Sequence, residues 1–117
     1  MPRFTLYTPS AASAQLGPLT LLDNVSTPTN FITYDNSPKA VHIAYVIEKN
    51  GEIQTGSVVV AFDGVETSLT DTNIDTAVVM GISFYAEYVS PTEMVLKYTS
   101  SLTGFPATFT YYETVWR

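Results

Sequence analysis

Hydrophobic and polar residues alternate along much of this chain with a period of two, which is the pattern of half-buried β-strands. The clearest run is 40–49, and a second run, 52–62, follows it after Asn50-Gly51. This dipeptide tolerates positive φ angles at both positions, so it favours a tight hairpin turn. We therefore predict a hairpin in which one face of its first strand carries Val41, Ile43, Tyr45 and Ile47.

The same pattern predicts further strands towards the C-terminus. Asp63-Gly64 is a second turn signal, after which we expect a short strand at 65–69 and a polar loop at 70–76. The later strands are expected at 77–89, with Gly81 marking a bulge, at 94–99 and at 107–116. In the last of these, the residues expected on one face are Phe109, Tyr111, Glu113 and Val115.

Residues 1–39 have a different texture, because five of the seven prolines lie here among small polar residues. Proline lacks the amide donor that a sheet requires, so it is confined to edges, turns and bulges. We expect short strands at 3–7, 19–22 and 30–34, and one helical turn at 10–15. The division that follows is an extended arm, 1–39, and a β-sandwich, 40–117. The alternative is that 1–39 supplies the first strands of the same domain.

Composition agrees with an all-β fold. Seventeen threonines and eight tyrosines accompany many valines, and all three residue types suit a pleated, half-buried surface. A chain of 117 residues with 45% hydrophobic content supports one domain with a core of its own. The predicted fold is an antiparallel β-sandwich or jelly-roll-like barrel with an extended N-terminal arm.

Charge and cysteine content narrow the function. The net charge is −6, which argues against nucleic acid as a partner because phosphate binding needs a basic surface. The chain has no cysteine, so disulfides and thiolate sites are excluded. No secretory signal and no apolar run of membrane-spanning length is found, so we expect synthesis in a cytoplasm and no membrane partner.

No motif for catalysis is found. The only imidazole, His42, lies in the middle of a predicted strand, where a packed or half-exposed histidine is the simpler interpretation. We therefore expect no enzymatic activity, no cofactor and no metal. Turn carboxylates are ligands that calcium prefers, so the sequence leaves open a calcium site formed by Asp63, Glu66, Asp71 and Asp75.

Aromatic residues give the candidate interface. Tyr111 and Tyr112 alternate along the last predicted strand, so both of its faces carry bulky side chains, and Trp116 lies near its end. Tyrosine and tryptophan bury a large area while keeping a polar tip, which favours subunit or sugar contacts. Together with two residues of the arm, the candidate interface residues are Tyr7, Phe31, Tyr111, Tyr112 and Trp116. The alternative is aromatic pairing between strands of a single sandwich.

Residues 41–112 resemble a β-sandwich module of tailed-bacteriophage virion proteins. The resemblance rests on an ordered set of short segments rather than on any one of them. In chain order they are Tyr45-Val46-Ile47-Glu48-Lys49-Asn50-Gly51, Gln54-Thr55-Gly56-Ser57-Val58-Val59-Val60, Leu69-Thr70-Asp71, Gly81-Ile82-Ser83-Phe84, Val95-Leu96-Lys97-Tyr98-Thr99, Leu102-Thr103-Gly104 and Phe109-Thr110-Tyr111-Tyr112.

The resemblance implies a non-enzymatic structural protein of the virion, on the capsid surface or the tail. A short chain of one arm and one sandwich suits a capsid decoration or cement subunit that stabilises the head through arm and sheet contacts. Its expected partners are the major capsid protein or other virion proteins and further copies of itself, with a trimer as one arrangement. The alternative is a tail or fibre module that binds a receptor or glycan.

Overall fold

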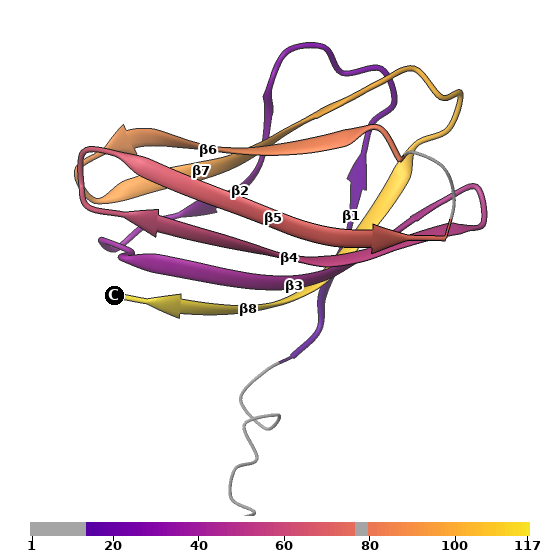
Figure 1. The fold of residues 1–117 in the computed structure, drawn as a ribbon. Coiled ribbons are helices and arrows are strands. Elements are labelled where there is room, and N and C mark those ends of the chain that lie inside the picture. Colours follow the sequence, from indigo (N-terminus) through magenta and orange to yellow (C-terminus); the bar gives the residue numbers. More distant parts are fainter. Residues whose placement is uncertain (1–13, 77–79) are drawn as a thin grey trace, which may run out of the picture.

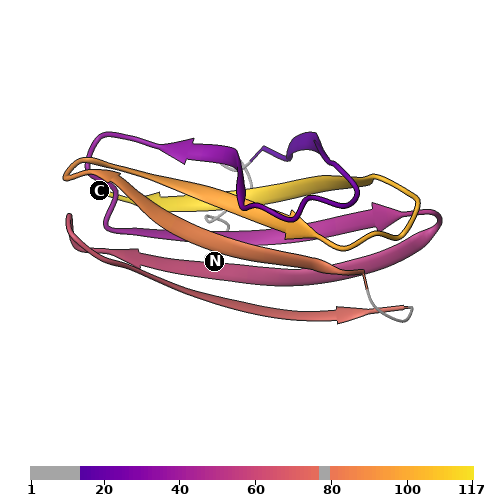
Figure 2. The same cartoon turned by 90° about the horizontal axis from the view of Figure 1, so that it is seen from above.

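Two antiparallel sheets lie face to face in the computed structural model, which describes residues 14–76 and 80–117 (Figure 1). One sheet has five strands in the order β1-β8-β3-β4-β5, and the other has three in the order β2-β7-β6. Strands of both sheets run along the same long axis, as in aligned sandwiches (Figure 2). The predicted all-β sandwich is therefore confirmed. The strands are β1 (Leu16–Leu21), β2 (Thr29–Tyr34), β3 (Ala40–Lys49), β4 (Glu52–Phe62), β5 (Thr67–Asp75), β6 (Ile82–Ser90), β7 (Glu93–Ser100) and β8 (Ala107–Trp116).

The β3–β4 hairpin forms as the sequence predicts. Its strands have the expected bounds, and every residue of β3 is paired with β4. Asn50 and Gly51 have φ angles of 50° and 82°, which are the left-handed values that a two-residue hairpin requires. Alternate residues of β3 are buried, so one face of this hairpin forms the floor of the core.

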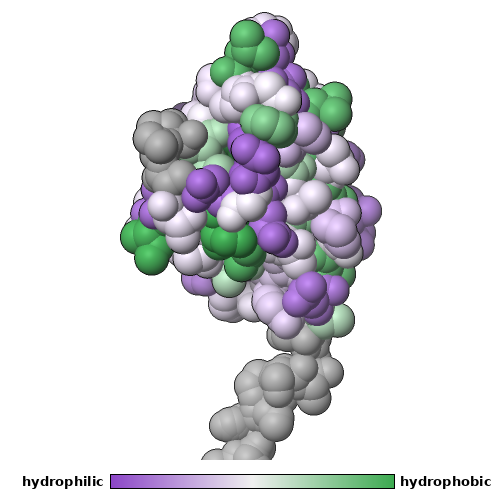
Figure 3. Space-filling model, turned by 90° about the vertical axis from the view of Figure 1, so that its right-hand side faces the viewer, coloured by the Kyte–Doolittle hydropathy of each residue, from purple (hydrophilic) through white to green (hydrophobic). Residues whose placement is uncertain are grey.

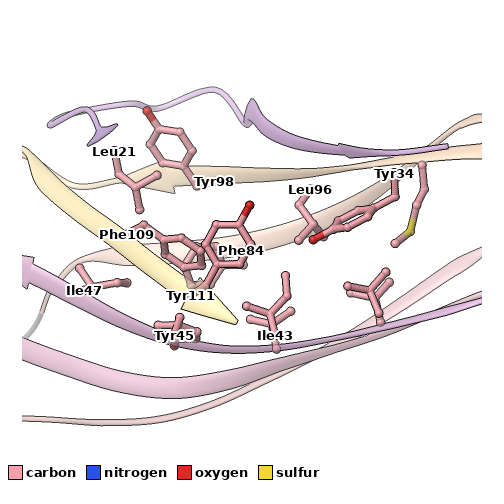
Figure 4. Close-up of a cluster of buried hydrophobic side chains, with 14 of the residues drawn as sticks. Leu21, Tyr34, Ile43, Tyr45, Ile47, Phe84, Leu96, Tyr98, Phe109 and Tyr111 are labelled. Carbon is pink, nitrogen blue, oxygen red and sulfur yellow. The ribbon is translucent and has the colours of Figure 1, made fainter. Parts of the chain in front are cut away.

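The core between the sheets is rich in aromatic rings (Figure 4). Phe109 of β8 is at its centre and is only 1% exposed. Its ring centroid lies 5.2 to 5.6 Å from those of four other rings, which is the range of favourable aromatic pairs. Those rings come from both sheets and belong to Phe31, Tyr45, Phe84 and Tyr111.

Part of the segment expected to be an arm lies in the sandwich. β1 pairs with β8, and β2 pairs with β7, so 16–34 contributes one edge strand to each sheet. Pro18 lies in β1, where an edge position leaves its missing amide without cost. The alternative of first strands within the same domain describes 16–34. The strand predicted at 3–7 lies outside the described residues.

Two expected elements differ from the structure. The loop predicted at 70–76 is wrong, because β5 continues to Asp75 and pairs with β4 over its whole length. Hydrogen bonds to β4 hold this polar stretch as an edge strand although its pattern has few apolar positions. The strand predicted from 77 begins only at Ile82, and Gly81 precedes it with a φ of 74° instead of forming a bulge within it.

Three loops are tied together at the end of the sandwich that holds the Asn50–Gly51 turn. Asp23 accepts hydrogen bonds from the amides of Thr103 and Gly104, both at 2.9 Å, and from Thr103 Oγ1 at 2.7 Å. Lys49 is almost fully buried, and its Nζ donates to the carbonyl of Met80 at 2.8 Å and to Thr103 Oγ1 at 3.1 Å. Hydrogen bonds from Thr103, followed by that from Gly104, hold the pKa of Asp23 below its ordinary value of 3.8.

We expect Asp23→Ala to destabilise the fold at neutral pH by a margin that shrinks in acid. The folded state binds the carboxylate form, so its contribution is complete above the unfolded pKa of about 3.8. That contribution is lost as the pH falls through the lower pKa of the folded state. Urea unfolding of wild type and variant between neutral pH and about pH 2 measures the difference.

Asp35→Ala is the control for this prediction, because Asp35 makes only an exposed ion pair of 3.9 Å with Arg117. We expect almost no change from it at any pH. An Asp23→Ala effect of equal size at neutral and acid pH would contradict the role assigned to this carboxylate.

Candidate functional site

The best candidate site is a surface, namely the side of the five-stranded sheet that faces away from β6 and β7 (Figure 1). The strand registers place the outward side chains of β8, β3, β4 and β5 in rows across it. One row is Trp116, Ala40, Ala61 and Ser68; the next are Thr114, His42, Val59 and Thr70, then Tyr112, Ala44, Ser57 and Thr72, then Thr110, Val46, Thr55 and Ile74, and finally Thr108, Glu48 and Ile53. We call these residues the outer face.

The outer face is almost free of charge. Glu48, in the last row at one end, is the only acidic or basic residue among them. The other charged residues of these four strands belong to the opposite side of the sheet or to strand ends, as Glu113 and Asp71 do. In a chain with a net charge of −6, an uncharged surface of this width needs an explanation.

Several large apolar side chains project from the outer face. Tyr112 and Trp116 are each 46% exposed, and Ile74 is 73% exposed. Val46 and Val59, in the two central strands, are also exposed. The rings of Trp116 and His42 lie 4.4 Å apart, so they cover one another in part. Together these side chains form a broad apolar surface on a rigid sheet, which is typical of an interaction site.

Tyr112 stands between two shallow hollows of the outer face. One hollow of about 260 Å³ includes Ala44, Ser57 and Val59 among its lining residues. The other, of about 160 Å³, lies towards Val46 and Gln15. The hollows arise because the neighbouring strands carry small side chains beside a large ring. The surface therefore has a protruding ring next to a space into which a ring can fit.

The structure separates the five predicted interface residues. Tyr7 lies outside the described residues. Phe31 packs in the core, with ring centroids 5.6 Å from those of Phe84 and Tyr98, and Tyr111 is 8% exposed. Tyr112 and Trp116 lie on the outer face. Alternation in β8 had distinguished Tyr111 from Tyr112, but it does not say which of the two faces is covered.

Sequence reasoning missed the contribution of β4 and β5 to this surface. Val59 and Ile74 were not singled out, and 70–76 was expected to be a loop. A signal was present in β3 and β4, where the positions that alternate with the buried ones contain almost no charged residue. A sheet face exposed to water usually carries lysine and glutamate, so their absence could have identified the surface.

The turn carboxylates are engaged in local hydrogen bonds. Asp63 Oδ1 accepts from the amides of Val65 at 2.9 Å and Glu66 at 2.7 Å, and these bonds lower its pKa. Asp71 accepts from the hydroxyl of Tyr45 at 2.7 Å, while burial, followed by this bond, raises the pKa of Tyr45. Among residues 14–76 and 80–117, no three acidic or histidine side chains come close enough to hold a metal ion.

The largest hollow, about 660 Å³, is an open groove at the other end of the sandwich. It runs between the β4–β5 turn and β6, and its lining includes Lys39, Asp63, Glu66 and Tyr88. Tyr88 is 45% exposed, and its ring lies 6.4 Å from that of Phe62. A half-exposed ring beside carboxylates can stack on a sugar and bind its hydroxyl groups.

The end that holds the Asn50–Gly51 turn is different again (Figure 3). Hydrophobic residues appear there as separate spots among polar ones. Loop residues Leu22, Leu102 and Phe105 are exposed, but single apolar side chains of this kind are common on protein surfaces. The outer face therefore remains the stronger candidate.

Comparisons with known proteins give no match to this chain among family models, curated proteins or solved structures. In the described ranges the structure contains no helix that could span a membrane.

Proposed function

We propose that this protein is a non-enzymatic structural subunit of a tailed-bacteriophage particle, and that it decorates and reinforces the capsid. The single observation that carries the proposal is the outer face, which is broad and nearly uncharged and exposes Tyr112 and Trp116. The ordered set of segments that resembles virion β-sandwich modules supplies the assignment to a phage particle.

Such a subunit would act through passive contacts. Apolar surface buried against neighbouring subunits contributes about 25 cal/mol per Å², and the rigid sheet limits the loss of conformational entropy. A particle carries many symmetric copies, so modest contacts at each one add up to a large stabilisation of the shell. The partners are then the major capsid protein and neighbouring copies of this chain.

Attachment to heads tests the proposal. We expect the purified chain to bind heads of the same phage that were assembled without it, and to raise the temperature at which they break. Tyr112→Ala should lower the bound amount at least about tenfold, because a central aromatic residue contributes strongly to an interface. Sedimentation of heads with bound protein measures the occupancy.

Tyr85→Ala is the matched control for this measurement. Tyr85 is 42% exposed and lies on β6, on the other sheet, so its loss should leave attachment unchanged. If wild-type protein does not bind these heads at all, the proposed function is wrong.

The groove at Tyr88 supports a second candidate, a receptor- or glycan-binding module of a tail or fibre. It combines an exposed ring with carboxylates in one open hollow. A glycan array separates the two candidates. Binding that is lost in Tyr88→Ala and kept in Tyr112→Ala would favour the tail or fibre role.

A further inference from the structure

The outer face has a shape that fits itself. Tyr112 protrudes from β8, and the hollow of about 260 Å³ beside it has Ala44 and Ser57 among its lining residues. In a two-fold symmetric contact each copy offers the same surface, so a protruding group must meet a hollow of the same face. The outer face holds both features next to each other.

Its area also suits a contact between two copies. The ten residues of β3 and the width of four strands cover roughly 33 by 19 Å, or about 600 Å² in each copy. Two copies would together bury about 1,200 Å², which is the lower limit of specific protein interfaces. The expected contact is therefore reversible and of moderate affinity.

Charge selects this face for self-association. Each copy has a net charge of −6, so two copies repel one another wherever acidic surfaces meet. The outer face avoids this repulsion, because its one charged residue, Glu48, lies in the row at its end. Contact at the centre of the face brings together only alanine, serine, threonine, histidine, valine and aromatic residues.

We propose that two copies of this chain pair through their outer faces, with Tyr112 of each copy in the hollow beside Ala44 and Ser57 of the other. The inference rests on the proposed function, since it identifies the neighbouring subunit that covers the face. Side chains of the two sheets interdigitate across a gap of about 10 Å between backbones, as between stacked sheets in general.

The oligomeric state in solution is the first test. Sedimentation velocity at protein concentrations up to about 100 µM should detect a dimer of the full chain. Ser57→Glu places a like charge from each copy in the contact and should weaken dimerisation at least about tenfold. Ser83→Glu makes the same change at an exposed position of β6, on the other sheet, and should leave the dimer intact.

Cross-linking identifies the surfaces that meet. The natural chain has no cysteine, so a single cysteine can be placed without interference. Two copies of Ala44→Cys should be joined by a bismaleimide that spans about 10 Å, whereas Ser83→Cys should not be joined. This test does not depend on the folding of the Ser57→Glu variant.

Three results would overturn the inference. They are a wild-type monomer throughout the concentration range, a dimer that Ser57→Glu does not weaken, and Ala44→Cys copies that do not cross-link. A cross-link between the two cysteines of a single Phe4→Cys/Ala44→Cys chain would instead show that residues 1–13 cover the face. Head binding by a protein that stays monomeric would retain the proposed function and reject only the pairing.

Discussion

Phe109→Ala should lower the free energy of unfolding by about 3–5 kcal/mol, which is the usual cost of removing a buried phenylalanine ring. Phe109 is 1% exposed, and its ring contacts aromatic rings from both sheets. Those neighbours are anchored on separate strands, so they cannot close the space that the ring leaves. Urea unfolding monitored by tyrosine and tryptophan fluorescence measures the loss.

Thr108→Ala, one residue earlier on the same strand, is the matched control for the Phe109 prediction. Its side chain points outward and is exposed, so we expect a change within about 0.5 kcal/mol. A loss below about 1 kcal/mol for Phe109→Ala would mean that the sheets can collapse around the cavity, and that this cluster is less rigid than its ring geometry implies.

Gly56→Ala should cost about 1–3 kcal/mol, because a side chain at this position has no space. A Cβ atom there would overlap the Thr72 carbonyl and would lie 2.7 Å from Cβ and 2.9 Å from Cα of Asn73. These atoms belong to β5, and two of the three are backbone atoms, so the edge strand itself must move. Amide exchange should show β5 opening more often than β3.

Ser57→Ala tests whether the effect is specific to the close approach. Ser57 is adjacent in β4 but points outward and is exposed, so its loss should change stability little. Unchanged amide exchange along β5 in Gly56→Ala would contradict the expected displacement.

Local pattern was enough to predict the hairpin of β3 and β4. Alternation gives the buried face, and Asn50-Gly51 gives the turn, so both signals lie within a few residues of one another. The limits of β8 were predicted for the same reason. In each case the strand has apolar residues on its inner face, and that face is buried.

The edges of the sheets could not be predicted in this way. β5 is polar over most of its length, and it becomes a strand through hydrogen bonds to β4. β1 joins β8, a strand about 90 residues away along the chain, and no local signal encodes a partner at that distance. The candidate surface depends on the same pairings, which bring Trp116 beside Ala40 and Val59 beside His42.

The strand order has a consequence for how the chain acquires its structure. β8 lies between β1 and β3, and β7 lies between β2 and β6, so a late strand completes the interior of each sheet. During synthesis, β1 and β2 have no partners until more than half of the described chain has been made. Closure of the sandwich must therefore follow translation of Trp116, and the early strands depend on remaining unaggregated until that point.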